Sequence, residues 1–378
     1  MRTIFNKSIL LAIPAIVFMA SCKKDTPETT TPTTPTTTTP TYTVPATYNK
    51  FTNVDYASSK KRIAMLGEMI TYIRTAHTTT ATPVLSAVKL KDMYANANAQ
   101  FTDANLNTSG IQLKDQTSSL YNLATDLDAS FDSIAAITQT TPNASSGVGG
   151  KLVSGTSAYI VDANGLEFKE LVEKGIMGGV FYSRATIILS NIGTYDNSTV
   201  TNGSTAQERA WDEAFGYFGV PDSFPLVTTG VKNWGSYCNS VSVSLTGSST
   251  NASSFNVIIM NAFLKGRAAI SNKDNTVRDE QKQIIIKTWE KVGAARFITY
   301  VKQAKTNIAD DGKRSHLLSE GVGFIKAFRY NSSKTITDAQ INTLLGYFGT
   351  NFYNVTTTNL DNAINDMATI FGLDASKL

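Results

Sequence analysis

Residues 211–221 read WDEAFGYFGVP and combine two adjacent acids with a dense run of aromatic side chains. At helical spacing Trp211, Phe215 and Phe218 lie three and four residues apart, so they share one helix face. Pro221 ends the helix, because proline lacks the amide donor and clashes with the preceding turn. The stretch therefore predicts a helix whose aromatic face packs into a core.

The two acids of this helix have two interpretations. Glu213 follows Arg209 by four residues, so an ordinary surface ion pair accounts for it. Asp212 lies along one edge of the aromatic face, where a carboxylate needs a partner. The alternative is that Trp211, Asp212 and Glu213 contribute to a binding site.

The same helical periodicity extends in both directions from this stretch. After residue 48 only four prolines occur, and alternating strand-like runs are rare. Besides the helix ending at Pro221, the predicted helices cover residues 58–75, 84–101, 112–137, 164–193, 254–272, 275–305, 313–330, 337–353 and 357–371. The fold class is therefore all-α: packed antiparallel helices in a domain of residues 48–378, as one body or as two helical-bundle halves, 48–200 and 201–378.

One segment breaks the helical pattern. Residues 222–254 are rich in Gly, Ser and Asn, so we expect a long irregular segment, with 240–245 (SVSVSL) as the best strand-like run. Trp234 and Tyr237 lie within it and offer aromatic surface to a ligand such as a glycan.

The long helix 164–193 carries glycines and acids together. Three glycines in its middle suggest close packing against another helix or a break near a ligand, since each costs roughly 1 kcal/mol relative to alanine. The pairs Lys169–Glu173 and Glu170–Lys174 have i,i+4 spacing, and we expect both to be solvated. Glu167 has no such partner and is a candidate binding residue.

The start of the chain predicts export and lipid attachment. Residues 1–21 carry Arg2 and Lys7 before a short apolar run, and they end in Met-Ala-Ser before Cys22. This order is that of a lipoprotein signal peptide, with Cys22 as the lipidated first residue of the mature chain. Acylated Cys22 would hold the protein on a lipid bilayer of the cell envelope, and we expect the outer membrane, on either face.

Residues 22–47 form a predicted linker. Threonine and proline dominate it, and this composition cannot bury an apolar core. At the polyproline rise its Thr/Pro tract would reach about 70 Å. The tract therefore separates a folded body from the lipid surface.

Charge and cysteine content exclude several classes of protein. The chain has 34 basic and 30 acidic residues, and removing the signal takes away two basic ones, leaving a net charge of +2. This balance argues against a nucleic-acid partner. With Cys22 lipidated, Cys238 alone remains, so a disulfide framework and a cysteine zinc site are excluded. We expect Cys238 to be a buried small hydrophobe.

The chain contains two histidines, and one of them stands near an acid at helical spacing. His316 precedes Glu320 by four residues, so both side chains project from one helix face. Leu317, Gly323 and Phe324 place Glu320 toward the apolar side. Such a pair can chelate a divalent metal or act as an acid and base, and a plain ion pair is the alternative. His77 stands in the polar stretch HTTTATP, and we expect it at the surface.

Motifs of known enzyme chemistry do not occur. The sequence has no nucleophile elbow, no H-E-x-x-H, no phosphate loop and no dinucleotide fingerprint. A hydrolase is therefore the third hypothesis and rests only on the paired acids.

Four segments carry a resemblance to a known family. They are EKGIMGGVFY (173–182), WDEAFGYFG (211–219), RDEQ with TWEKVGAARFITY (within 278–300) and HLLSEGVGFIKAFRY (316–330). In this order, and over nearly all of 48–378, they resemble an uncharacterised family of Bacteroides-type lipoproteins, the domain of unknown function 4856. That family is distantly similar to imelysin-like proteins, helical exported proteins linked to uptake of iron or other metals. The imelysin motif G-x-H-x-x-E does not occur in that spacing here, since three residues separate His316 and Glu320.

Together these observations predict a membrane-anchored binding lipoprotein. It would capture a metal ion or metal complex, iron or another divalent metal, in a pocket between helices. The expected metal ligands are Asp212, Glu213, His316 and Glu320, with Glu167 and Glu290 as further candidates; pairing with Lys287 or Lys291 is the alternative for Glu290. The runner-up is a surface accessory protein that binds a glycan or a partner outer-membrane receptor or transporter.

Overall fold

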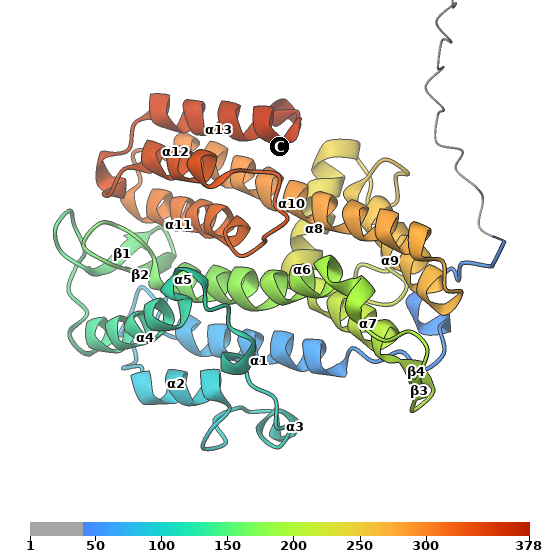
Figure 1. Cartoon of the computed structure of the whole chain (residues 1–378). Helices are drawn as coiled ribbons and strands as arrows, with labels where there is room; N and C mark the ends of the chain where they lie inside the picture. Colours follow the sequence, from blue (N-terminus) through green and yellow to red (C-terminus); the bar gives the residue numbers. More distant parts are fainter. Residues whose placement is uncertain (1–40) are drawn as a thin grey trace, which may run out of the picture. The chain divides into compact units, whose positions relative to one another are not determined.

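Helices make up most of the described chain, which confirms the all-α prediction. The structure is a computed structural model that describes residues 41–378, and the signal peptide, Cys22 and most of the linker lie outside them. Residues 42–378 form one unit, which Figure 1 shows from α1 to α13. Its α-helices are α1 (Ala57–Arg74), α2 (Ala87–Ala95), α3 (Ala104–Asn107), α4 (Leu123–Thr140), α5 (Phe168–Ile176), α6 (Ser183–Ser190), α7 (Ala206–Phe218), α8 (Asn233–Thr246), α9 (Phe255–Ser271), α10 (Asn275–Thr306), α11 (Asp311–Phe328), α12 (Asp338–Phe348) and α13 (Thr357–Phe371).

The longest helix, α10, organises the second half of the chain. It packs against α8, α9, α11 and α13, and α11 in turn packs against α5, which contacts α1 and α4 (Figure 1). Two small antiparallel hairpins complete the unit: β1 (Gly150–Ser154) with β2 (Ser157–Val161), and β3 (Val200–Thr201) with β4 (Ser204–Thr205). The first hairpin contacts α11 and α5, so it lies beside the site described below.

The aromatic helix α7 is buried as its sequence predicts. A capping box between Thr205 and Glu208 opens it, and Gly219 closes it at a positive φ of 80°. Trp211, Phe215 and Phe218 are all 1 % exposed or less, and the Trp211 indole donates a hydrogen bond to the Phe263 carbonyl at 3.0 Å. The acidic residues of α7 are thus carried on a helix fixed in the core.

The composition of residues 222–254 predicts a long irregular segment, and the structure contradicts this prediction. Residues Asn233–Thr246 form α8, and the strand-like run SVSVSL lies inside this helix. Trp234 and Cys238 of α8 are buried against the core, and tertiary packing of these residues outweighs the low helix propensity of the serines. The predicted burial of Cys238 is confirmed, whereas Trp234 is not accessible to a glycan.

Other differences concern helix ends. The helix predicted at 112–137 begins only at Leu123, and Leu120 before it is 49 % exposed. The helix predicted at 275–305 is confirmed as α10, and Asp274 caps it, because its carboxylate accepts the Val277 amide at 3.0 Å.

The glycines of the helix predicted at 164–193 mark a change of helix type. Between α5 and α6 the residues Met177–Tyr182 form a π-helical turn, in which Gly178 and Gly179 lie. A Cβ on Gly178 would lie 2.8 Å from the Cβ of Ala327, so the glycine lets this turn approach α11 closely. The close-packing interpretation is therefore confirmed.

A second glycine contact gives a test of core packing. A Cβ on Gly266 of α9 would lie 2.0 Å from the buried Trp211 ring, so Gly266→Ala is expected to cost about 1–3 kcal/mol by overpacking. Gly346 of α12 has nothing within 4 Å of that position, so Gly346→Ala is expected to gain about 0.5–1 kcal/mol. Urea unfolding of both variants measures the contrast, and equal effects would contradict the predicted packing.

Candidate functional site

A group of buried charged side chains lies where α5, α11, the end of α1 and the β1–β2 hairpin meet. Glu167 precedes the first turn of α5, and its amide donates to the Ser319 hydroxyl of α11 at 2.8 Å. Glu167 and Glu170 are both fully buried. We call the following set the charged cluster: His77, Glu167, Lys169, Glu170, Glu173, Lys174, His316 and Glu320.

Both histidines of the chain reach the same carboxylate. His316 Nδ1 lies 2.7 Å from Glu167 Oε2 and 3.5 Å from Glu170 Oε1. His77 Nδ1 lies 3.6 Å from Glu167 Oε1, which is too long for a hydrogen bond. The Tyr159 ring of β2 stacks on His316 at 4.8 Å and meets His77 edge-on at 6.2 Å, so it fixes both imidazoles.

Two polar atoms of this arrangement lack hydrogen-bond partners among the described residues. They are Glu167 Oε1 and His77 Nε2, and both are buried. Buried acceptors and donors are nearly always satisfied, so each unpaired one asks for an explanation. In addition, single ligand atoms of Glu167, Glu170 and His316 all lie within 4.8 Å of one another.

The lysines of α5 neutralise part of this negative charge. Lys174 Nζ lies 2.9 Å from Glu170 and 3.7 Å from Glu173, and Lys169 pairs with Glu170 and Glu173. The predicted i,i+4 pairs therefore exist, but they are buried and not solvated as expected. The reason is that α5 turns them toward α11, where Gly323 leaves room: a Cβ there would lie 2.4 Å from the Cβ of Lys174.

The network shifts the pKa of its members in opposite directions. Burial alone would raise the pKa of Glu170, but Lys169 and Lys174 outweigh it and hold that pKa well below its usual range. Burial lowers the pKa of His316, but the hydrogen bond and charge of Glu167 outweigh it and raise that pKa. For His77 burial dominates over Glu167, so its pKa is lowered.

Glu320 is the least compensated acid of the cluster. Burial, followed by the charge of Glu170, raises its pKa to about 7. Lys174 Nζ lies 2.8 Å from its Oε2, yet this contact lacks hydrogen-bond geometry. Because Lys174 is shared with Glu170 and Glu173, it offsets only part of the burial of Glu320. The predicted position of Glu320 toward the apolar side is thus confirmed.

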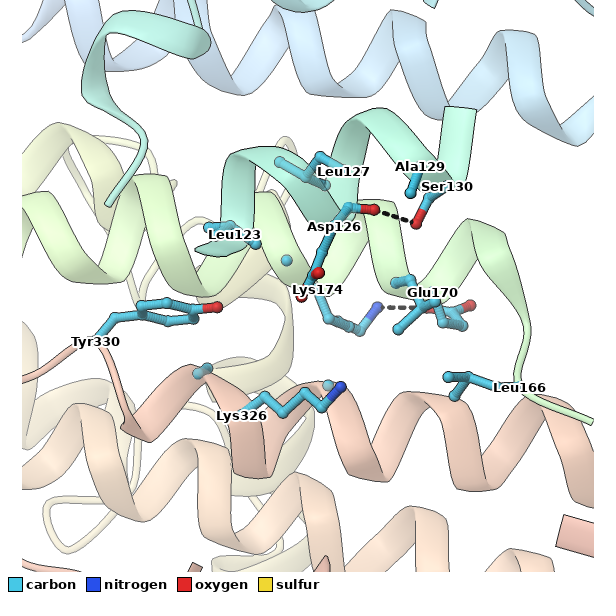
Figure 2. A pocket seen from close by; sticks show the side chains of 14 residues that line it. Leu123, Asp126, Leu127, Ala129, Ser130, Leu166, Glu170, Lys174, Lys326 and Tyr330 are labelled. Carbon is cyan, nitrogen blue, oxygen red and sulfur yellow. Dashed lines mark hydrogen bonds and ion pairs between the residues drawn. The ribbon is translucent and has the colours of Figure 1, made fainter. Parts of the chain in front are cut away.

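The charged cluster is mostly buried, but parts of its side chains reach solvent. The side chain of His316 is 19 % exposed, and that of His77 is 11 % exposed, so the predicted surface position of His77 is wrong. Glu170 and Lys174 also line a cavity of about 270 Å³ between α4, α5 and α11, shown in Figure 2. The charged cluster therefore reaches solvent at the two histidines and borders the cavity at Glu170 and Lys174.

The structure does not bring Asp212 and Glu213 to this cluster. Asp212 is fully buried and accepts hydrogen bonds from Tyr48 and Arg267, both at 2.8 Å, and from the Asp55 amide. Its neighbour Glu213 faces the other way and pairs with Arg184 at 3.0 Å, instead of the expected Arg209. Each acid therefore has its own arginine, and the four expected metal ligands do not form one group.

Trp211 and Glu290, two further predicted site residues, are buried in the core and away from the charged cluster. Trp211 packs beside Gly266, as described above. Glu290 is fully buried, and its carboxylate accepts hydrogen bonds from the amide and the hydroxyl of Thr335 at 2.6–3.0 Å. It therefore holds the loop after α11 and does not pair with a lysine of α10. Of the expected site residues, the structure brings together His316, Glu320 and Glu167.

Sequence reasoning missed five members of the charged cluster: His77, Lys169, Glu170, Glu173 and Lys174. Glu170 and Lys174 have the spacing of a surface pair, and nothing local distinguishes a buried pair from a solvated one. A usable signal for His77 was its rarity, since both histidines of the chain occur here. No helix of the described residues is long and apolar enough to cross a membrane.

The comparison with known proteins gives a family and nothing beyond it. The chain matches no curated protein and no solved structure. Residues 41–374, which include every α-helix of the unit and the whole charged cluster, match the family described as domain of unknown function (DUF4856). The protein therefore belongs to the DUF4856 family.

Proposed function

We propose that this protein is an exported binding lipoprotein, anchored in the bilayer through acylated Cys22, that captures a divalent metal ion such as iron at the charged cluster. The observation that carries the proposal is the convergence of Glu167, Glu170 and His316 from two helices. Two ligand atoms bonded to one ion at about 2.1 Å are at most about 4.2 Å apart, so small side-chain rotations would complete this set. Mixed carboxylate and imidazole donors suit iron, zinc and manganese.

The unpaired atoms support a metal over a purely structural ion network. A structural network satisfies its buried acceptors, because an unsatisfied one costs about 1–3 kcal/mol. Here Glu167 Oε1 and His77 Nε2 are both left without a partner. A cation beside Glu167 would use the free oxygen, and His77 is near enough to serve as a fourth donor after a ring rotation.

The proton balance of the site predicts how binding depends on pH. His316 must be neutral to donate a lone pair to a metal, and its pKa is raised. Metal therefore displaces a proton from His316, and affinity is expected to rise as pH increases past 6.5, the ordinary pKa of a histidine. The lysines beside Glu170 compete with the ion, which favours reversible capture over permanent storage.

The predicted signal peptide, lipidation at Cys22 and Thr/Pro linker support a location in the cell envelope. A tethered binding body would hand its cargo to an outer-membrane receptor or transporter. The distant similarity to imelysin-like proteins, which are linked to metal uptake, is in line with this role.

The test is a metal titration of metal-free protein. Purified residues 42–378 are exchanged into chelator-treated buffer, titrated with Fe²⁺ under anaerobic conditions, and separately with Zn²⁺ and Mn²⁺, against a chromophoric competitor. We expect one ion per chain, and a loss of affinity of at least tenfold in Glu167→Gln and in His316→Ala. Metal content after desalting is measured independently by mass spectrometry.

Matched controls separate this site from the other candidate acids. Glu213→Gln and Glu290→Gln remove carboxylates outside the charged cluster, and both are expected to keep the affinity of the parent protein. Protein that stays metal-free at micromolar concentrations of all three ions would contradict the proposal. Equal affinity in the parent and in folded Glu167→Gln would contradict it as well.

A further inference from the structure

The cavity beside the charged cluster has the features of a second binding site. It lies between α4, α5 and α11 and has a volume of about 270 Å³. Its apolar wall consists mainly of four leucines and an alanine: Leu123, Leu127, Leu166, Leu171 and Ala327. For comparison, an apolar cavity of about 150 Å³ accommodates benzene, so this one has room for a larger organic molecule.

Two polar groups face this cavity without partners: Lys326 of α11 and Tyr330, which follows the end of this helix. Figure 2 shows the Lys326 ammonium and the Tyr330 hydroxyl on the α11 side of the cavity, opposite α4. Among the described residues neither group has a side-chain hydrogen bond, and Lys326 has no ion pair, while Tyr330 is only 7 % exposed. Both are donors, so together they offer a place for an acceptor that carries negative charge.

The neighbouring charges limit what that acceptor can be. Lys174 also lines the cavity, but Glu170, Glu173 and Glu320 already surround its ammonium group. Asp126 lies exposed at the rim and repels a second negative charge. One available cation therefore favours a monoanion over a phosphate dianion, and the leucine wall favours an apolar body attached to it.

From this arrangement we propose that the cavity binds a small organic monocarboxylate, with its carboxylate on Lys326 and Tyr330 and its apolar body against the leucines of α4 and α5. The site goes beyond the proposed metal capture, because the carboxylate would contact Lys326 and Tyr330 and neither histidine nor Glu167, although Glu170 borders both sites. Burial lowers the pKa of Lys326, with Asp126 opposing, and a bound carboxylate would offset that loss. A charge-assisted hydrogen bond in a partly apolar site is the type of contact that gives such a ligand its affinity.

Calorimetric titration with octanoate tests the proposal, and octanamide serves as the neutral ligand of the same shape. Metal-free residues 42–378 are used, with chelator present, so that the outcome is independent of the metal site. We expect octanoate to bind at least tenfold more tightly than octanamide. Lys326→Met is expected to remove this preference, and Tyr330→Phe is expected to weaken octanoate about threefold.

Two further variants keep the test independent of the stability of α11. Ala129 is exposed and lines the cavity, so Ala129→Trp is expected to block octanoate at the rim without disturbing the core. Ala136→Trp places the same ring on an exposed position of α4 away from the cavity and is expected to leave binding unchanged. Equal binding of acid and amide would overturn the proposal, and so would unchanged binding in Lys326→Met or in Ala129→Trp. Absence of binding at millimolar octanoate would overturn it too.

Discussion

Replacing Asp212 with alanine is expected to remove about 3–5 kcal/mol from the free energy of unfolding, because it leaves a buried arginine without its main partner. Arg267 is 1 % exposed, and its Nε donates to Asp212 at 2.8 Å. The Tyr48 hydroxyl, also fully buried, loses the same acceptor. The guanidinium group of Arg267 then keeps only Glu208 and Ser271 as side-chain hydrogen-bond partners. Urea unfolding followed by circular dichroism measures the loss.

The adjacent acid provides the matched control. Glu213→Ala removes the same charge from the next position of α7, but its pair with Arg184 is partly exposed, with 25 % and 32 % of the two side chains in solvent. Exposed pairs contribute about 0–1 kcal/mol, so Glu213→Ala is expected to be nearly neutral. Similar losses in the two variants would show that Asp212 does not hold Arg267 in the way that the contacts indicate.

A double variant separates the pair from the packing around it. In Asp212→Leu combined with Arg267→Met both charges of the pair are replaced by apolar groups, so neither is left buried without the other. Glu208, which loses its contact with Arg267, keeps the Thr205 amide and the Ser271 hydroxyl as donors. Such replacements often recover stability, so the double variant is expected to be more stable than Asp212→Ala. This result would assign Asp212 to the architecture of the core.

The helices could be predicted from sequence because their signal is local. The apolar face of 357–371 recurs every three to four residues, and the predicted range coincides with α13. In α8 the local signal pointed elsewhere, since SVSVSL alternates like a strand while Trp234 and Cys238 bury the segment as a helix. Contacts made by residues distant in sequence decided that case.

The sequence predicts correctly only the part of the charged cluster whose residues lie on a single helix. His316 and Glu320 share a face of α11, and their spacing alone places them together. Which other acids join them depends on how α5 and the end of α1 pack against α11, and no spacing within a helix encodes that packing. Glu167 is recognisable from sequence because no cation stands one turn away. Asp212 also lacks a cation at i,i+4 spacing, but its partner Arg267 comes from α9, which the local sequence does not reveal.

The last expectation concerns Glu320, whose burial makes the protein less stable as pH rises. Its pKa is raised to about 7 in the folded chain, against 4.5 ordinarily. Below pH 4.5 the group is protonated in both states and contributes nothing to the difference. As pH rises from 4.5 to 7 the unfolded chain loses this proton first, so the free energy of unfolding falls, and above pH 7 the loss is complete. At about 1.4 kcal/mol per pKa unit, this loss is roughly 3 kcal/mol.

Glu320→Gln is therefore expected to stabilise the metal-free protein at pH 8 by up to roughly 3 kcal/mol, and this difference is expected to shrink as pH falls toward 5. The amide resembles the protonated acid in shape and does not ionise, and Lys174 keeps Glu170 and Glu173 as partners. His316 also loses stabilisation as pH rises through its raised pKa, and because Glu167 and Glu170 contribute more to that rise than Glu320 does, most of this loss is common to both proteins. Urea unfolding from pH 5 to pH 9 with chelator present measures the difference, with Glu280→Gln on α10 as the control for loss of one carboxyl group. A variant less stable than the parent at pH 8 would mean that the ion pair with Lys174 outweighs the burial of Glu320, and that its carboxylate is already compensated without a metal.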